Sequence, residues 1–301
     1  MTPTRATPLR QAERRAGLLF CLPWLLGFLL FTAGPILTSI GLSFAWYDVL
    51  NRPAFVGLEN YTRLLTGDPL FWKSLANTLY ITVVGVPLGV LTGLSLAMLL
   101  NLNVRGLTWY RTIYYLPSIV PVVASSILWT WILNPQFGLL NAALQGMGIN
   151  GPSWLASETW AKPGIILMGL WGSGSTMLIY LAGLKGIPRH LYESAEVDGA
   201  NRWRRFIHIT IPMLTPTLFF TTTMGIIGSF QVFTQAYVMT GGGPVDSTLF
   251  YVYYLFNNAF GYLRMGYASA QAWVLFVIIL AVTLLQLKMA RHWVYYEVEA
   301  R

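Results

Sequence analysis

The densest group of ionisable side chains in this 301-residue chain lies in one polar segment, residues 185–212. Glu193 and Asp198 supply carboxylates there, beside the small residues Ser194-Ala195 and Gly199-Ala200. Carboxylates can pair with basic groups of another protein, and small residues let a partner approach the backbone closely. The alternative is a solvated surface helix in which Arg189 and Glu193 pair at i,i+4, a contact worth only about 0.2–0.5 kcal/mol. These residues alone leave both interpretations open.

Arrangements for catalysis are missing from the sequence. No H-E-x-x-H, G-x-S-x-G or cysteine cluster occurs, and all three histidines fall on segments that we expect in the cytoplasm. The one lysine followed by serine or threonine, Lys73, comes after Phe71-Trp72 rather than glycine, so the chain has no P-loop. The sequence therefore predicts that the protein is not an enzyme, and that any ATP which drives it is bound by another chain.

Two other features have simple interpretations. Gly241-Gly242-Gly243-Pro244 follows no predicted strand and precedes no lysine, so we expect a tight external turn rather than a nucleotide loop. The single cysteine, Cys21, lies in an apolar run after Phe20, which favours packing in the membrane over catalysis or lipidation.

The elements that must position the polar segment are membrane helices. Hydrophobic residues make up 55% of the chain and charged residues only 10%, against about 25% in soluble domains. A bilayer core needs roughly 20 apolar residues per helix. Six uncharged stretches are long enough, and they run over residues 17–45, 76–101, 112–133, 163–183, 213–238 and 266–287.

The distribution of charge predicts the orientation of these spans. An even number of spans places both termini on one side, where 14 basic and 6 acidic residues give a net charge of +8. The other side carries 5 of each and is neutral. Basic residues concentrate in cytoplasmic loops, so both termini are expected in the cytoplasm. The positive charge of the chain is thus a topology signal and does not indicate a nucleic-acid partner.

The spans themselves contain no Asp, Glu, Lys, Arg or His. Proton- and ion-coupled carriers commonly need such residues in their pathway, so this class is disfavoured, although sodium coupling through backbone carbonyls stays open. Uncharged polar and aromatic side chains can still hydrogen-bond the hydroxyl groups of a sugar and stack on its ring. The candidates for such contacts are Trp171, Ser175, Ser229, Gln231 and Gln271.

A row of small residues marks the second span. Gly85, Gly89, Gly93 and Ala97 recur at four-residue intervals, so they share one face of the helix. Small residues on one face let a second helix approach closely. We interpret the row as a packing surface rather than a ligand site.

Two short helices are expected in the polar segment. Pro188 suits the first turn of a helix and Gly199 its C-terminal exit, which predicts a helix over residues 188–198. Asn201 can cap a second helix that ends before Pro212.

The polar segment resembles the E-A-A…G…I-x-L-P loop of binding-protein-dependent ABC importer permeases. Glu193-Ser194-Ala195, Gly199 and Ile209-Thr210-Ile211-Pro212 carry the resemblance, with Ser194 in place of an alanine and Ile211 in place of a leucine. Tracts similar to the carbohydrate-type branch, as in maltose and glycerol-3-phosphate importers, occur in order along the chain at residues 55–61, 111–117, 129–134, 240–244 and 266–270.

The resemblance implies an all-α integral membrane protein with the type I (MetI-like) permease fold: a cytoplasmic tail over residues 1–16, six helices over 17–290 and a second tail over 291–301. It implies that the chain lies in a bacterial plasma membrane. It also implies three kinds of partner: a second permease subunit, two ATPase subunits that bind ATP and magnesium, and an external solute-binding protein. This chain itself would bind no cofactor. Residues 188–200 would form the coupling helix that docks on the ATPase, through Glu193, Ser194, Ala195, Asp198, Gly199 and Ala200. The expected solute is a sugar or oligosaccharide; the competing hypotheses are a sodium-coupled secondary carrier and a polytopic membrane enzyme or assembly factor.

Overall fold

The computed structural model describes residues 8–102 and 105–295, with side chains from residue 16 onward. Predicted charges at Arg5, Glu297, Glu299 and Arg301 lie outside the described residues. The chain forms two compact units, one of residues 1–67 with 258–274 and one of residues 68–257 with 275–301. The division of residues 17–290 into one permease domain with flanking tails stays a prediction.

The first unit combines helices with the only strand pair in the described part of the chain. β1 and β2 pair antiparallel, with Ala45 opposite Phe55. Asn60 is buried and its amide donates to Ser43 O (3.0 Å) and Ala45 O (2.9 Å), which attaches α3 to the end of α2. The elements are α1 Pro8–Phe28, the π-helical turn η1 Leu29–Ala33, α2 Gly34–Ser43, β1 Ala45–Trp46, β2 Ala54–Phe55, α3 Glu59–Thr66 and the start of α16 Met265–Trp293.

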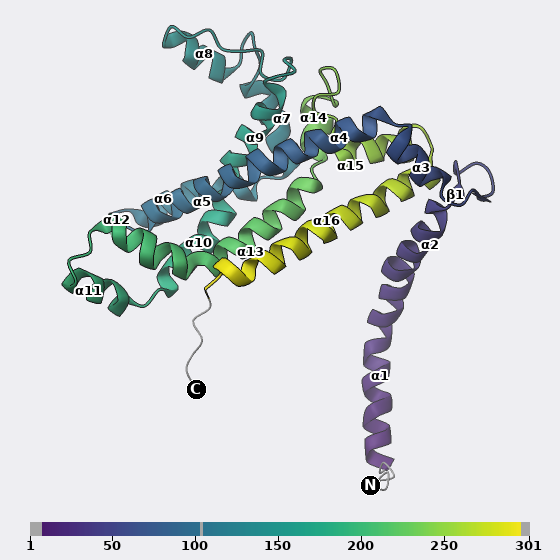
Figure 1. Ribbon diagram of the computed structural model, residues 1–301, viewed down its shortest axis with the longest axis horizontal. Coiled ribbons are helices and arrows are strands. Elements are labelled where there is room, and N and C mark those ends of the chain that lie inside the picture. Colours follow the sequence, from purple (N-terminus) through teal and green to yellow (C-terminus); the bar gives the residue numbers. More distant parts are fainter. Residues whose placement is uncertain (1–7, 103–104, 296–301) are drawn as a thin grey trace. The chain divides into compact units, whose positions relative to one another are not determined.

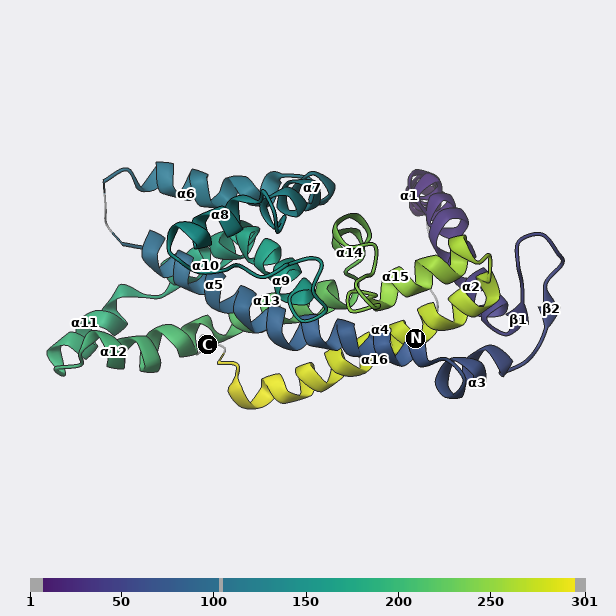
Figure 2. The same ribbon diagram turned by 90° about the horizontal axis from the view of Figure 1, so that it is seen from above.

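The second unit is a cluster of helices (Figures 1 and 2). Its elements are α4 Pro69–Tyr80, the π-helical turn η2 Ile81–Gly85, α5 Val86–Leu100, α6 Leu107–Tyr115, the 3₁₀ helix η3 Leu116–Ile119, α7 Val122–Ile132, α8 Leu139–Gly146, α9 Ala161–Trp171, α10 Gly174–Gly186, α11 Arg189–Val197, α12 Arg202–Arg205, the π-helical turn η4 Phe206–Thr210, α13 Ile211–Phe230, α14 Thr234–Met239, α15 Tyr251–Phe256 and the remainder of α16; a further π-helical turn, η5 Asn257–Gly261, spans the boundary of the units.

The core of the second unit lies where α5, α10 and α13 meet. Ala97, Met177, Tyr180 and Leu214 are fully buried there. A Cβ added at Gly93 would lie only 3.0 Å from the Thr176 side chain, so the glycine lets α5 and α10 approach closely. This part of the predicted row of small residues has the packing role expected of it.

Four helices are long and apolar enough to cross a membrane without a break, over residues 16–43, 69–100, 202–230 and 265–293. Two further pairs, α6 to α7 and α9 to α10, are apolar enough to cross as bent spans. The structure thus provides between four and six candidate spans at the six places where the sequence predicts them.

The third, fourth and fifth predicted spans are not the continuous helices that their composition suggested. The fifth, predicted over residues 213–238, ends at Phe230, and α14 begins at Thr234. The third bends by 100° between α6–η3 and α7, because Val120 and Pro121 are extended (ψ 130° and 137°). A residue before proline is sterically biased against the helical region, which explains the break. The fourth bends by 50° between α9 and α10, at Gly172-Ser173.

Three prolines inside the first, second and fifth spans are accommodated by widened turns, whereas Pro23 and Pro216 lie within the regular helices α1 and α13. The π-helical turns η1, η2 and η4 each end two residues before a proline, which is Pro35, Pro87 or Pro212. A proline ring clashes with the carbonyl one turn earlier in a regular helix, and a wider turn displaces that carbonyl. For this reason the second helix of the polar segment does not end before Pro212, as predicted, but continues through it into the fifth span.

Candidate functional site

The polar segment between α10 and α13 forms a helical hairpin at one end of the second unit (Figures 1 and 2). α11 ends as the sequence predicts: Gly199 has a positive φ of 76°, its N–H donates to Glu196 O (3.0 Å), and Ala200 N donates to Ala195 O (2.8 Å). This pair of bonds defines a Schellman ending, which favours glycine. Asn201 then caps α12, where its side-chain oxygen accepts from Arg204 N at 2.8 Å.

Two side-chain contacts attach α11 to the helix that follows. Glu196 forms an ion pair with Arg205 of α12. The Tyr192 hydroxyl hydrogen-bonds the Thr210 hydroxyl at 2.9 Å, in the π-helical turn η4. Because residues 202–230 form one unbroken helix, α11 is connected through these contacts to the whole fifth span.

The outer face of this hairpin combines carboxylates, small residues and apolar side chains. Of the residues predicted to dock, Glu193, Ser194, Asp198 and Gly199 are exposed, and Ala195 and Ala200 are half-buried. Val197 is 89% exposed and Trp203 66% exposed. Such large exposed apolar side chains amid polar ones are typical of protein contact surfaces. The sequence reasoning missed both, although their apolar type within a polar segment was a signal.

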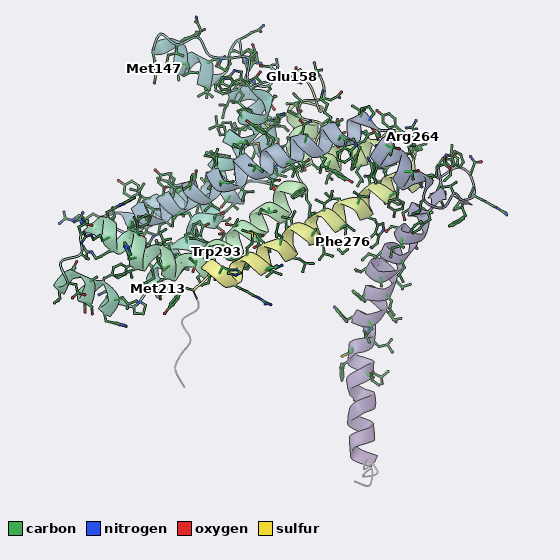
Figure 3. The ribbon with its side chains drawn as sticks, viewed as in Figure 1. Met147, Glu158, Met213, Arg264, Phe276 and Trp293 are labelled. Carbon is green, nitrogen blue, oxygen red and sulfur yellow. The ribbon has the colours of Figure 1, made fainter. Side chains whose placement is uncertain are left out.

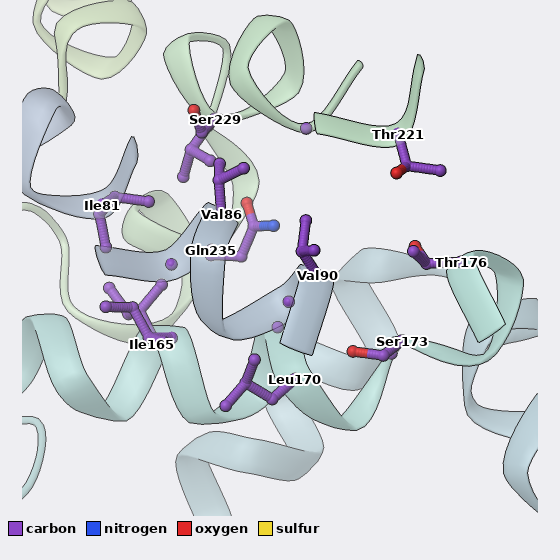
Figure 4. Close-up of a pocket in the computed structure, with 17 residues that line it drawn as sticks. Ile81, Val86, Val90, Ile165, Leu170, Ser173, Thr176, Thr221, Ser229 and Gln235 are labelled. Carbon is purple, nitrogen blue, oxygen red and sulfur yellow. The ribbon is translucent and has the colours of Figure 1, made fainter. Parts of the chain in front are cut away.

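A second site is a partly open cavity of about 260 Å³ lined by the second, fourth and fifth spans. Figure 4 shows hydroxyl and amide groups around it, and none of its lining side chains is charged. The polar members are Ser173, Thr176, Thr221, Ser229 and Gln235, and glycines at 85, 89, 169, 172 and 225 form much of the wall.

The hydroxyl groups of the cavity are held by neighbouring helices. Ser229 Oγ lies 2.8 Å from Thr82 Oγ1, which joins α13 to η2. The Tyr180 hydroxyl lies 2.6 Å from Thr221 Oγ1 and joins α10 to α13. A cavity with uncharged hydrogen-bonding groups and no ionisable group suits a neutral, hydroxylated solute.

The predicted pathway residues are distributed unequally around this cavity. Ser229 lines it, whereas Trp171, Ser175 and Gln231 are exposed outside its lining, and Gln271 is buried in the first unit. The sequence reasoning missed Ser173, Thr176, Thr221 and Gln235. In the fifth span, Thr221, Gly225 and Ser229 recur at four-residue intervals. This spacing places them on one face of the helix and was the signal that could have identified them as cavity-lining residues.

The Gly241–Pro244 tract forms turns that are bound to the second span. Lys73 Nζ donates to Val245 O at 2.6 Å, and the amide of Asn77 donates to Asp246 O at 2.8 Å. Thr240 and Thr248 are joined through their hydroxyls at 2.6 Å. The tract is therefore a structured turn, in agreement with the turn interpretation.

Comparisons with known proteins agree with these features. Residues 85–294 match the model of the family described as "Binding-protein-dependent transport system inner membrane component". The chain is 45% identical to the probable ABC transporter permease protein YesP of Bacillus subtilis, over 95% of this chain and 93% of that protein. It is 36% identical to the lactose transport system permease protein LacF of Rhizobium radiobacter, over 97% and 99%.

Among solved structures, the chain is similar to one in the crystal structure of a bacterial alginate ABC transporter in complex with an alginate pentasaccharide-bound periplasmic protein. The TM-score is 0.80 and the sequence identity 25%, covering 93% of this chain and 96% of the other. The similarity thus extends over nearly the whole chain.

Proposed function

This chain belongs to the binding-protein-dependent transport system inner membrane components, in the carbohydrate-type ABC importer branch, and we propose that it forms half of a pathway for an uncharged sugar or oligosaccharide. The observation that carries this proposal is the cavity of about 260 Å³, whose lining has hydroxyls and an amide but no charge. The name of the lactose permease supports a sugar as the solute. A second permease chain would supply the other half of the pathway.

Coupling to ATP hydrolysis is assigned in this proposal to residues 188–200. Glu193 pairs with a basic group of an ATPase subunit, the small residues Ser194, Ala195, Gly199 and Ala200 allow close seating, and Asp198 completes the acidic face. The exposed Val197 and Trp203 supply apolar contact area. ATP and magnesium are bound by the two ATPase chains, and an external solute-binding protein delivers the sugar. The protein lies in a bacterial plasma membrane, and both of its termini lie in the cytoplasm.

The contacts of α11 supply a route for that coupling. Movement of α11 acts on the fifth span through the Glu196–Arg205 ion pair and the Tyr192–Thr210 hydrogen bond. The unbroken helix of residues 202–230 is about 40 Å long at 1.5 Å per residue, and Thr221 and Ser229 of its far half line the cavity. Closure of the ATPase dimer would thereby shift the walls of the sugar cavity.

The experiment is reconstitution of the chain with its co-purifying partners in lipid vesicles. We expect solute uptake that requires ATP, a second permease, an ATPase and the binding protein. Uptake by this chain alone, without ATP, would instead support a sodium-coupled carrier, an alternative that family membership does not favour.

A charge reversal tests the coupling helix itself. Glu193→Lys should reduce uptake and binding-protein-stimulated ATP hydrolysis to background, because it places a positive charge against a basic partner. Glu193→Asp, which keeps the negative charge at the same exposed position, serves as the matched control and should retain most of the uptake. Normal transport by Glu193→Lys in an assembled complex would refute the role of this residue.

A further inference from the structure

The first unit contains a pocket that the sugar pathway does not use. Its volume is about 390 Å³, and it lies between the loop after α2, the helix α3 and the turn before α16. Two guanidinium groups line it, Arg63 and Arg264, together with the carboxylate of Asp48 and the rings of Trp46, Tyr262 and Tyr267. Figure 3 shows Arg264 next to the start of α16, which begins at Met265.

The walls of this pocket are held by contacts within the first unit. Gly266 N donates to Tyr47 O at 3.2 Å, and a Cβ at Gly266 would overlap Ala45 O, so the start of α16 lies directly against β1 and the loop after it. Leu263 adopts a left-handed conformation (φ 55°), which is strained for a leucine, and Arg264 N donates to Asn258 O at 2.7 Å. The turn that presents Arg264 is therefore a defined one.

Both arginines are available to bind an anion. Arg63 lies over the Tyr267 ring and Arg264 over the Tyr262 ring, each at 5.7 Å from the ring centroid. Within the residues described, neither guanidinium is within ion-pair distance of a carboxylate. Asp48 accepts instead from Asn51, through its backbone N–H at 2.8 Å and its amide at 2.7 Å, and these bonds lower the pKa of the carboxyl. The pocket thus carries two positive charges and one negative charge.

The position of the pocket along the chain identifies the anion. α2 ends at Ser43 and α16 begins at Met265, so the pocket lies where the first and sixth spans leave the bilayer. Trp46 is 52% and Tyr262 60% exposed, as expected for aromatic residues at the membrane–water interface. At this level the most abundant anion is the phosphate of the lipids.

We propose that this pocket binds the phosphate of a phospholipid headgroup. Guanidinium groups suit this ligand because they bind phosphate oxygens through two parallel hydrogen bonds, while the tyrosine faces fix their planes. The exposed Trp46 supplies apolar surface that suits the glycerol and upper acyl carbons of the same lipid. The bound headgroup occupies the pocket beside the contact between the loop after α2 and the start of α16.

The test is native mass spectrometry of the assembled complex, purified in a detergent that removes bulk lipid. We expect one phospholipid to remain per copy of this chain in the wild type. The double variant Arg63→Gln/Arg264→Gln should lose it, whereas Arg52→Gln, a change at an exposed arginine outside the pocket, should retain it. Equal retention in the double variant and the wild type would overturn the proposal.

Two further arms keep the result decisive. The double variant Arg63→Lys/Arg264→Lys keeps both positive charges but removes the planar guanidinium groups, so it should retain less lipid than the wild type. This variant provides the test if the glutamine variant does not assemble. The delipidated wild type is also titrated with inorganic phosphate, with thermal stability as the readout. Stabilisation by phosphate without any retained phospholipid would assign the pocket to a free anion and overturn the lipid assignment.

Discussion

At the residue scale, Gly199 provides the turn that ends α11, and in the proposed docking it also leaves space for a partner. Its positive φ of 76° is a conformation that costs other L-residues roughly 1–2 kcal/mol, asparagine less. Yet a Cβ at Gly199 would meet no atom within 4 Å in this chain, so any collision of a side chain there must come from a partner. Substitutions at Gly199 can distinguish the requirement for a left-handed backbone conformation from the requirement for space beside a docking partner.

We therefore expect Gly199→Asn to assemble with nearly wild-type thermal stability, because asparagine tolerates the left-handed conformation, but to lose most of its coupled ATP hydrolysis. Gly199→Ala should lose stability by about 1 kcal/mol from the same backbone strain. ATPase assays and thermal unfolding of the purified complex distinguish these effects. If Gly199→Asn transports at the wild-type rate, the glycine serves only the turn.

At the scale of elements, the small-residue row of the second span performs two tasks. A Cβ at Gly89 would meet nothing within 4 Å, since this residue lines the cavity, whereas one at Gly93 would press on Thr176 and Tyr180 at 3.0–3.3 Å. Overpacking a helix contact costs about 1–3 kcal/mol, which exceeds the gain of up to about 1 kcal/mol from replacing a helical glycine by alanine.

The same substitution at the two positions should then have opposite effects. Gly89→Ala is expected to maintain or raise thermal stability, and Gly93→Ala to lower it; thermal unfolding in detergent measures both. Gly89→Leu should fill the cavity and abolish uptake without loss of assembly. Unimpaired transport by Gly89→Leu would show that the solute does not pass through this cavity.

At the scale of the whole molecule, the charge asymmetry predicts the orientation of the spans. The side with the termini carries a net charge of +8 and the other side none. Replacement of Cys21 by serine removes the only cysteine, so that one new cysteine at a time can report on sidedness. Suitable exposed positions are Thr108, in the first turn of α6 at the start of the third span, and Ser153, between the third and fourth spans.

A membrane-impermeant maleimide added to intact spheroplasts should label the Ser153→Cys chain and leave the Thr108→Cys chain unmodified until the membrane is opened. The reverse pattern would invert the topology and place the polar segment on the outside, where no ATPase could dock. Labelling is read as a mass shift of the purified chain.

Features that depend on residues close together in the sequence were predictable. The six apolar stretches, the exit of α11 at Gly199 and the cap at Asn201 all follow from composition or from the chemistry of a few neighbouring residues. Each rests on local backbone preference or on transfer of apolar surface from water, and neither requires knowledge of the rest of the chain.

Tertiary structure alone decided which distant residues meet. Thr82 and Ser229 are joined by a hydrogen bond, and Arg63 and Arg264 share a pocket, although about 150 and 200 residues respectively separate the partners. The exposure of Trp171 and the burial of Gln271 likewise depend on which helix packs on which face. The physical reason is that a helix pattern identifies which residues share a face, whereas the bends at Pro121 and Gly172 and the contacts between helices determine what that face meets.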